Sequence, residues 1–74
     1  MRLESKGRGG KFVTVVFNLS FGAADATKHL KTLQSKLGTG GTYKDDMIEF
    51  RGDVRSKVED YFAALNIKII RAGG

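Results

Sequence analysis

The residues of this chain that could do chemistry are lysines, arginines and one pair of aspartates, set around two glycine-rich stretches. Residues 37–46 read LGTGGTYKDD, and residues 5–11 read SKGRGGK. Such stretches can cradle a phosphate, clamp a nucleic-acid backbone, or simply form tight connections between elements. Their neighbours in the sequence decide among these three readings.

A P-loop phosphate cradle requires a lysine followed by serine or threonine, after the glycines and at the start of a helix. Lys11 is instead followed by Phe12 and a predicted strand, and the other stretch comes after a predicted helix. Residues 38–41 spell the GxxG of KH domains, but that loop joins two helices, whereas here a strand follows. We therefore interpret Gly38 as a helix cap and the later glycines as room for close strand packing.

Catalysis requires a nucleophile with a base, or an acid and base pair in one pocket. His29 is predicted to be a surface or half-buried histidine, and the adjacent Asp45 and Asp46 to form a hydrated acidic tip. The chain has no cysteine and one histidine, which excludes thiolate metal sites and histidine clusters. The sequence predicts no catalytic residue, no metal site and no cofactor.

Positive charge is the stronger signal. Thirteen lysines and arginines face eight acidic residues, a formal charge of +5 that favours an anionic partner, although net charge also serves solubility. With few exposed aromatics predicted beside the cations, we expect docking on folded RNA by shape and charge rather than base stacking. The predicted RNA-binding residues are Lys6, Arg8, Gly9, Gly10, Lys11, Lys28, Lys31, Lys36 and Lys44.

The first half of the chain predicts a short strand, an exposed basic hairpin loop over residues 5–11, a strand over 12–19 and a helix over 23–37. The alternating strand pattern places Val13, Val15, Phe17 and Leu19 toward the core. The helix stripe is Ala26, Leu30, Leu33 and Leu37. Lys28 and Lys31 then project from the opposite, solvent face of the helix.

The second half predicts a hairpin of residues 42–44 and 47–51, with some distortion or lengthening of its turn because aspartate at the second turn position tolerates positive φ less well than glycine. Asp53 is the expected N-cap of a second helix, with an Arg55–Glu59 pair and a stop at Asn66. A strand over 67–71 and a short tail, 72–74, follow. Together these predict one domain, 1–74: a two-layer α/β sandwich, with two helices on one face of a mostly antiparallel sheet of four to five strands.

No apolar run approaches the roughly 20 residues that span a bilayer, and the first residues lack the apolar core of a signal peptide. We expect a cytoplasmic monomer with no membrane partner.

Several runs of this sequence resemble the translation initiation factor one family of eukaryotes and archaea, and resemble its bacterial homologues still more closely. They are KGRGGK, VTVV, KLGTGGTYKD, IEFRGDVRSKV and the terminal IKIIRAGG, which cover nearly all of residues 6–74. The resemblance implies an α/β sandwich, without catalytic residues or cofactor, that binds the small ribosomal subunit. There it would lie near the initiator tRNA and mRNA and help to reject wrong start codons.

The resemblance also implies roles for residues. The loop with Lys6, Arg8 and Lys11 would approach the decoding region, and Lys28, Lys31 and Lys36 would face ribosomal RNA. Asp45 and Asp46 would face the initiator tRNA and repel its backbone.

Two departures and two alternatives accompany these expectations. Many relatives have Asp-Gly where this chain has Asp45–Asp46, and the N-terminal tail that contacts other initiation factors in longer relatives is missing. The alternatives are a general RNA-binding regulator and a protein-interaction module. The latter would use the second helix or the open face of the sheet, where we expect Phe12, Val16 and Ile70 to be exposed.

Overall fold

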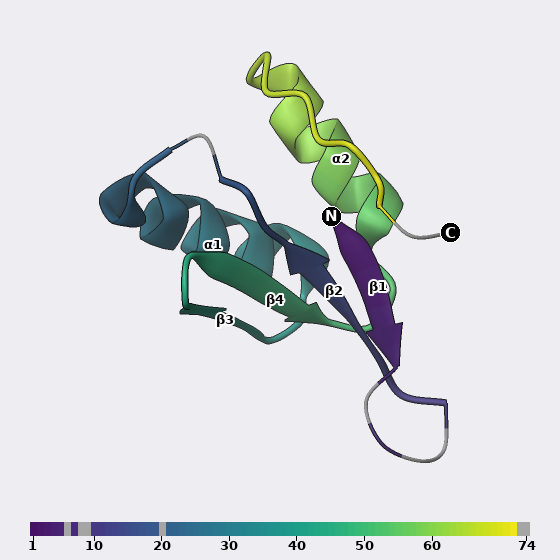
Figure 1. Ribbon diagram of the computed structural model, residues 1–74. Helices are drawn as coiled ribbons and strands as arrows, with labels where there is room; N and C mark the ends of the chain where they lie inside the picture. The colour runs from purple at the N-terminus through teal and green to yellow at the C-terminus, as the bar shows by residue number, and fades with distance from the viewer. Residues whose placement is uncertain (6, 8–9, 20, 73–74) are drawn as a thin grey trace.

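The computed structural model describes residues 1–5, 7, 10–19 and 21–72, and its elements follow the predicted order (Figure 1). A hairpin precedes the first helix, and a second hairpin separates the two helices. The described elements are β1 Arg2–Ser5, β2 Phe12–Val16, α1 Ala23–Leu37, β3 Gly41–Lys44, β4 Met47–Arg51 and α2 Arg55–Ala64.

The strands form one four-stranded antiparallel sheet in the order β1-β2-β4-β3. Thr14 pairs with Phe50, and Phe50 pairs with Gly41 on its other side. Directly paired residues project to the same face, so this register fixes which side chains meet the helices. The predicted α/β sandwich is confirmed.

The core lies between both helices and one face of the sheet. Val16, Ile48 and Phe50 come from the sheet and are at most 1% exposed. They cluster with buried side chains of α1 and α2, namely Ala26, Leu30, Leu33, Val58 and Phe62. The helices therefore cover the same face of the sheet.

The face of β2 predicted to meet the helices was wrong, although Val15 is buried and Leu19 packs against the core as expected. Val16 and Thr14 point to the helices, which leaves Val13 and Val15 on the other face of the sheet. Thr14 looked like a surface position, but it is completely buried, and its hydroxyl bonds the Gly52 carbonyl at 2.7 Å and the Val54 amide at 3.0 Å. The two hydrogen bonds replace those that the hydroxyl would make with water, so a polar side chain can be buried at this position.

The first helix has the predicted bounds. Its predicted stripe is buried at Ala26, Leu30 and Leu33 and half-buried at Leu37. Gly38 takes the left-handed cap at φ 63°, with its amide on the Gln34 carbonyl at 2.9 Å. The local signals for this helix were sufficient because its cap and stripe are both sequence-local.

The turn between β3 and β4 keeps two residues, Asp45 and Asp46, so the expected lengthening was wrong. Lys44 pairs directly with Met47, and the aspartates adopt φ of 53° and 59°. Positive φ at both central positions is the geometry that matches the twist of a tight hairpin. Aspartate reaches this region more readily than most residues.

The start of α2 also differs from the prediction. Val54, not Asp53, occupies the N-cap and makes no side-chain cap bond, although Asp53 Oδ1 accepts a hydrogen bond from the Arg55 amide at 3.4 Å. Arg55 pairs with Asp53, with Nε 2.9 Å from Oδ1, instead of with Glu59. The guanidinium hydrogen bond to Asp53 is the main reason that the pKa of this carboxyl is lowered.

The end of α2 follows the predicted stop at Asn66, whose φ is 61°. The amides of Asn66 and Ile67 bond the carbonyls of Ala63 and Phe62, which closes the helix as a Schellman motif. The predicted strand over residues 67–71 is absent as a strand. Beyond the Ile67 amide that closes the helix, the segment bonds Met1: the Met1 amino group donates to the Ile70 carbonyl, and the Ala72 amide donates to the Met1 carbonyl.

Candidate RNA-binding surface

Two of the predicted cations lie on the outer face of α1. Lys28 and Lys31 are exposed and lie three residues apart, on the side of the helix away from the buried stripe. Lys36 is also exposed, but it borders the groove between α1 and α2 together with Lys57. The structure therefore separates Lys36 from the other two lysines of the helix.

The basic stretch before β2 is described in part. Gly10 and Lys11 are exposed, and Gly10 has a φ of 69°. Lys6, Arg8 and Gly9 lie outside the described residues. Arg51, which the sequence prediction missed, is exposed at the end of β4 and pairs across the sheet with Val13, close to Lys11 in the chain. Only the strand register could reveal this neighbour.

The glycine-rich connection from α1 to β3 is a packing device. A Cβ on Gly41 would lie 2.8 Å from Leu30 Cδ1 and 2.9 Å from both the Glu49 carbonyl oxygen and Phe50 Cδ1. The Gln34 amide reaches over to the Gly41 carbonyl at 3.0 Å. The interpretation that these glycines stop the helix and admit close strand packing is confirmed.

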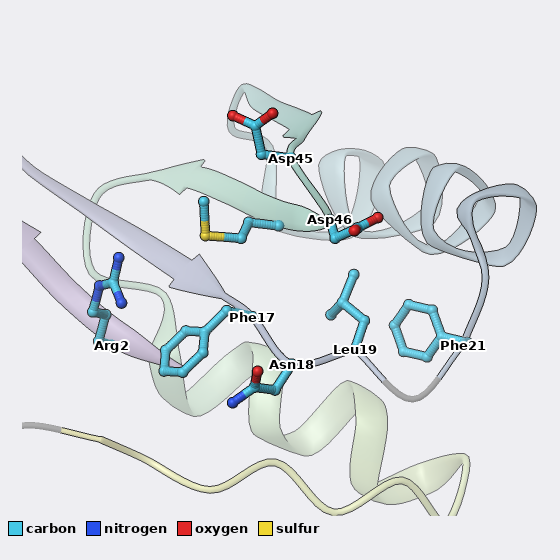
Figure 2. Close-up of a pocket in the computed structure, with 8 residues that line it drawn as sticks. Arg2, Phe17, Asn18, Leu19, Phe21, Asp45 and Asp46 are labelled. Carbon is cyan, nitrogen blue, oxygen red and sulfur yellow. The ribbon is translucent and has the colours of Figure 1, made fainter.

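The acidic turn, Asp45 and Asp46, is exposed. The Tyr43 hydroxyl donates to Asp46 Oδ1 at 3.1 Å, and desolvation, followed by this hydrogen bond, raises the pKa of Tyr43. Figure 2 shows the two carboxylates pointing to different sides of the turn. Lys44 is exposed beside them, at the opposite end of β3 from the glycine-rich connection, so it does not join Lys36.

A hollow of about 600 Å³ lies between the acidic turn and the residues that follow β2 (Figure 2). Phe17, Leu19 and Phe21 give it an apolar wall. The Arg2 guanidinium lies 4.9 Å from the centre of the Phe17 ring and also pairs with Glu4. The face of this aromatic ring is therefore already covered by a cation of the chain itself.

His29 is half-buried, as predicted, and serves packing. Its Nδ1 lies 2.8 Å from the Tyr61 hydroxyl, and its ring meets that of Phe21 edge-on with the centres 5.0 Å apart. Among the residues that the structure describes, no three acidic, histidine or cysteine side chains gather to hold a metal ion. No described helix is long and apolar enough to cross a membrane.

Ser5 and Phe12, which flank the connection between β1 and β2, lie at the opposite end of the sheet from the β3–β4 turn (Figure 1). Phe12 pairs with Ser5 at one end of β2, and Val16 pairs with Ile48, next to the acidic turn, at the other. We call the first the basic end, defined by Lys11 and Arg51. The basic end and the acidic turn thus lie a strand length apart, while Lys44 lies beside the acidic turn itself.

The three apolar residues considered for a protein-binding face differ in their exposure. Phe12 and Ile70 are exposed, at 42% and 69%, whereas Val16 is completely buried. The prediction for Val16 was wrong for the same reason as the β2 face. Phe12 and Ile70 also belong to different ends of the molecule, since Ile70 bonds Met1 before β1 and Phe12 follows the loop after β1. They do not form one apolar surface.

The chain matches the family described as "Translation initiation factor SUI1" over residues 1–68. It is 43% identical over 68 residues to an uncharacterized protein of Synechocystis sp., covering 92% of this chain and 61% of the relative. It is 35% identical over 71 residues to the uncharacterized protein YciH of Escherichia coli, covering 96% and 66%. A protein translation factor SUI1 homolog of Hyperthermus butylicus is 40% identical over 60 residues, covering 81% and 57%. The chain thus spans about three fifths to two thirds of the length of these relatives.

Proposed function

From the premise that the chain belongs to the SUI1 translation initiation factor family, we propose that it binds the small ribosomal subunit near the initiator tRNA and improves start-codon selection. It does so as a cytoplasmic monomer and without enzymatic chemistry, by occupying space and placing charge. The observation that carries the proposal is that one fold exposes cations on the outer face of α1 and at the basic end of the sheet, and an acidic turn at the opposite end of the sheet.

The docking surface consists of the exposed cations. Lys28 and Lys31 lie on the outer face of α1, and Lys11 lies at the basic end of the sheet. Phosphates bind to such surface cations with release of counterions, which gives affinity without sequence readout. The complete proposed RNA-binding set is Lys6, Arg8, Gly9, Gly10, Lys11, Lys28, Lys31, Lys36 and Lys44.

The acidic turn supplies discrimination. Asp45 and Asp46 are exposed at the far end of the sheet from Lys11, on a tight turn that fixes their positions. Anionic groups held near the initiator tRNA backbone oppose its full accommodation. Correct codon pairing then supplies the free energy that overcomes this repulsion, whereas a wrong start codon does not.

Equilibrium binding of the labelled protein to purified small ribosomal subunits, at several salt concentrations, tests the proposal. We expect saturation near one protein per subunit, with binding that survives excess unstructured RNA. A specific site saturates at one protein per subunit, and its affinity falls with salt along one defined slope. Nonspecific binding instead gives many weak sites per subunit. Loss of the protein to the competitor RNA would instead support a general RNA-binding regulator.

A further inference from the structure

A groove of about 730 Å³ runs between the end of α1 and the outer side of α2. The residues that line it follow helical spacing on both sides: i, i+3 and i+4 on α1, and i, i+3, i+4, i+7 and i+8 along α2. Each set therefore lies on one face of its helix. The lining residues are Leu33, Lys36, Leu37, Lys57, Asp60, Tyr61, Ala64 and Leu65.

The floor of the groove is apolar and partly open to solvent. Leu33 is completely buried beneath it, while Leu37 and Tyr61 are half-buried and pack against the core. Leu65 lies outside the core cluster and keeps 46% of its surface exposed. A single exposed leucine is ordinary, but apolar surface gathered in a concave groove is typical of a binding site.

The rim of the groove carries two cations and one carboxylate. Lys36, Lys57 and Asp60 are all exposed. The ion pairs found among the described residues are formed by arginines and involve neither of these lysines. The groove thus combines apolar contact with two ammonium groups that are available to carboxylates.

We propose that this groove binds an acidic amphipathic segment of a partner protein, with apolar side chains over Leu37 and Leu65 and carboxylates on Lys36 and Lys57. Charge complementarity favours an acidic segment over a basic one. From Lys57 to Leu65 the α2 stripe extends about 12 Å at 1.5 Å per residue, which matches a short helix whose apolar side chains repeat at i and i+4 or i+7. The inference goes beyond the proposed function because it adds a protein partner. Apart from Lys36, the groove shares no residue with the proposed RNA-binding set.

RNA and a second copy of the chain fit the groove less well. The Tyr61 ring already packs edge-on with His29, and its hydroxyl lies 2.8 Å from His29 Nδ1, so part of its surface is used within the fold. Phosphates and sugars would contact the lysines but would leave the leucine side chains exposed to water. Two copies that met through this groove about a two-fold axis would bring their rim lysines together, and like charges would repel.

Binding of defined peptides, measured by fluorescence anisotropy, tests the proposal. The probe is a labelled peptide of about twelve residues, made of alanine, leucine and glutamate, with leucines at i, i+4 and i+7 on one helical face and glutamates beside them. One companion peptide has lysine in place of every glutamate, and another has serine in place of every leucine.

Two variants of the protein, each with a matched control, locate the contact. Leu65→Ser removes apolar surface from the groove, and Ile70→Ser makes the same change at another exposed apolar position. Lys57→Glu reverses one rim charge, and Lys68→Glu does so at an exposed position outside the groove. Circular dichroism checks that each variant is folded.

We expect the leucine–glutamate peptide to bind wild-type protein about tenfold or more tightly than either companion. Leu65→Ser and Lys57→Glu should each weaken this binding about fivefold or more, whereas the two controls should leave it unchanged. Lys57→Glu should also bind the lysine peptide more tightly than wild-type protein does, a gain that unfolding could not produce. On titration, the backbone amide resonances that shift most in NMR spectra should belong to residues 33–37 and 57–65.

Four results would overturn the inference. Binding of the serine peptide as tight as that of the leucine peptide would reduce the contact to nonspecific charge attraction. Equal losses in the control variants would place the peptide outside the groove. Displacement of the peptide by a short oligouridylate that shifts the same amide resonances would assign the groove to RNA. A dimer in sedimentation experiments that Leu65→Ser abolishes would assign it to a second copy of the chain.

Discussion

The two hairpins of this protein have opposite designs. The β1–β2 hairpin has a glycine-rich basic connection, with Gly7 and Gly10 at positive φ and exposed. The β3–β4 hairpin has a tight turn of only two residues, both of which are aspartates. Both belong to one sheet, at opposite ends. The difference places a basic connection and an acidic turn at opposite ends of one small sheet, and the proposed function assigns RNA docking to cations such as those of the first and discrimination to the second.

The largest expected effect comes from reversing the charge of the two lysines on the outer face of α1. Lys28→Glu with Lys31→Glu should weaken subunit binding about a hundredfold near physiological salt, because phosphate contacts dominate such affinities. The fold should survive, since both side chains are exposed on the side of α1 away from the buried stripe. The matched control is Lys57→Glu with Lys68→Glu, the same charge change at two exposed positions elsewhere. Equal losses in both double variants would show that net charge, not this helix face, directs docking.

The packing at Gly41 supports both ends, because β3 joins the glycine-rich connection to the acidic turn. Gly41→Ala should lower the free energy of unfolding by about 1–3 kcal/mol, since the new methyl group meets Leu30, Glu49 and Phe50 below 3.0 Å. Chemical denaturation monitored by circular dichroism measures this loss. Gly40→Ala is the control, because a Cβ there would meet only the Arg51 side chain, at ordinary contact distances of 3.6–3.8 Å. Wild-type stability in Gly41→Ala would refute the packing role given to this glycine.

The backbone strain in the acidic turn can be reduced without changing the length of the turn. Asp46→Gly should raise the free energy of unfolding by about 0.5 kcal/mol, because glycine reaches φ near 59° without the steric cost borne by aspartate, offset in part by the entropy of the unfolded chain. Thermal unfolding measures the gain. A loss of stability would mean that the Tyr43–Asp46 hydrogen bond outweighs the backbone strain.

The smallest expected effect concerns an ion pair away from both hairpin tips. Arg71 Nη2 lies 2.8 Å from Glu59 Oε1, and this hydrogen bond is the main cause that lowers the pKa of Glu59 below its ordinary value of 4.5. A lowered folded-state pKa stabilises the fold above the unfolded value and loses that contribution as the pH falls through the folded value. Arg71→Gln should therefore reduce stability slightly at pH 7 and lose that difference in acid below the pKa of Glu59. Urea titrations at both pH values test this; a difference that persists in acid would assign it to packing.

Sequence reasoning succeeded where the signals were local. The bounds of α1, its cap at Gly38 and the stop at Asn66 each depend on residues within one or two turns. It failed for β2 because residues 13–16 contain apolar or β-branched side chains on both faces of the strand. Only the distant partners Gly52 and Val54 show that Thr14 points inward. The C-terminal segment failed for a similar reason, since its pairing depends on Met1.

For the candidate site, the sequence predicted the exposure of two lysines on α1 but not how cations from separate elements are arranged. Helical spacing alone predicts that Lys28 and Lys31 lie on the outer face of α1, and both are exposed there. The proximity of Arg51 to the basic stretch, and the separation of Lys44 from Lys36, depend on strand register across the sheet. Spacing along the chain carries no such information for residues brought together from separate elements.

We propose that docking depends on the exposed cations and discrimination on the acidic turn, so the two should be separable by mutation. The most direct measurement compares wild-type protein with Asp45→Asn plus Asp46→Asn in a reconstituted initiation assay, scoring both subunit affinity and the ratio of correct to near-cognate start codons. Asparagine tolerates positive φ as aspartate does, so the turn persists while its charge is removed. The account predicts unchanged affinity and a lower ratio. An unchanged ratio of correct to near-cognate start codons would contradict the account. A fall in subunit affinity in the double variant would also contradict it.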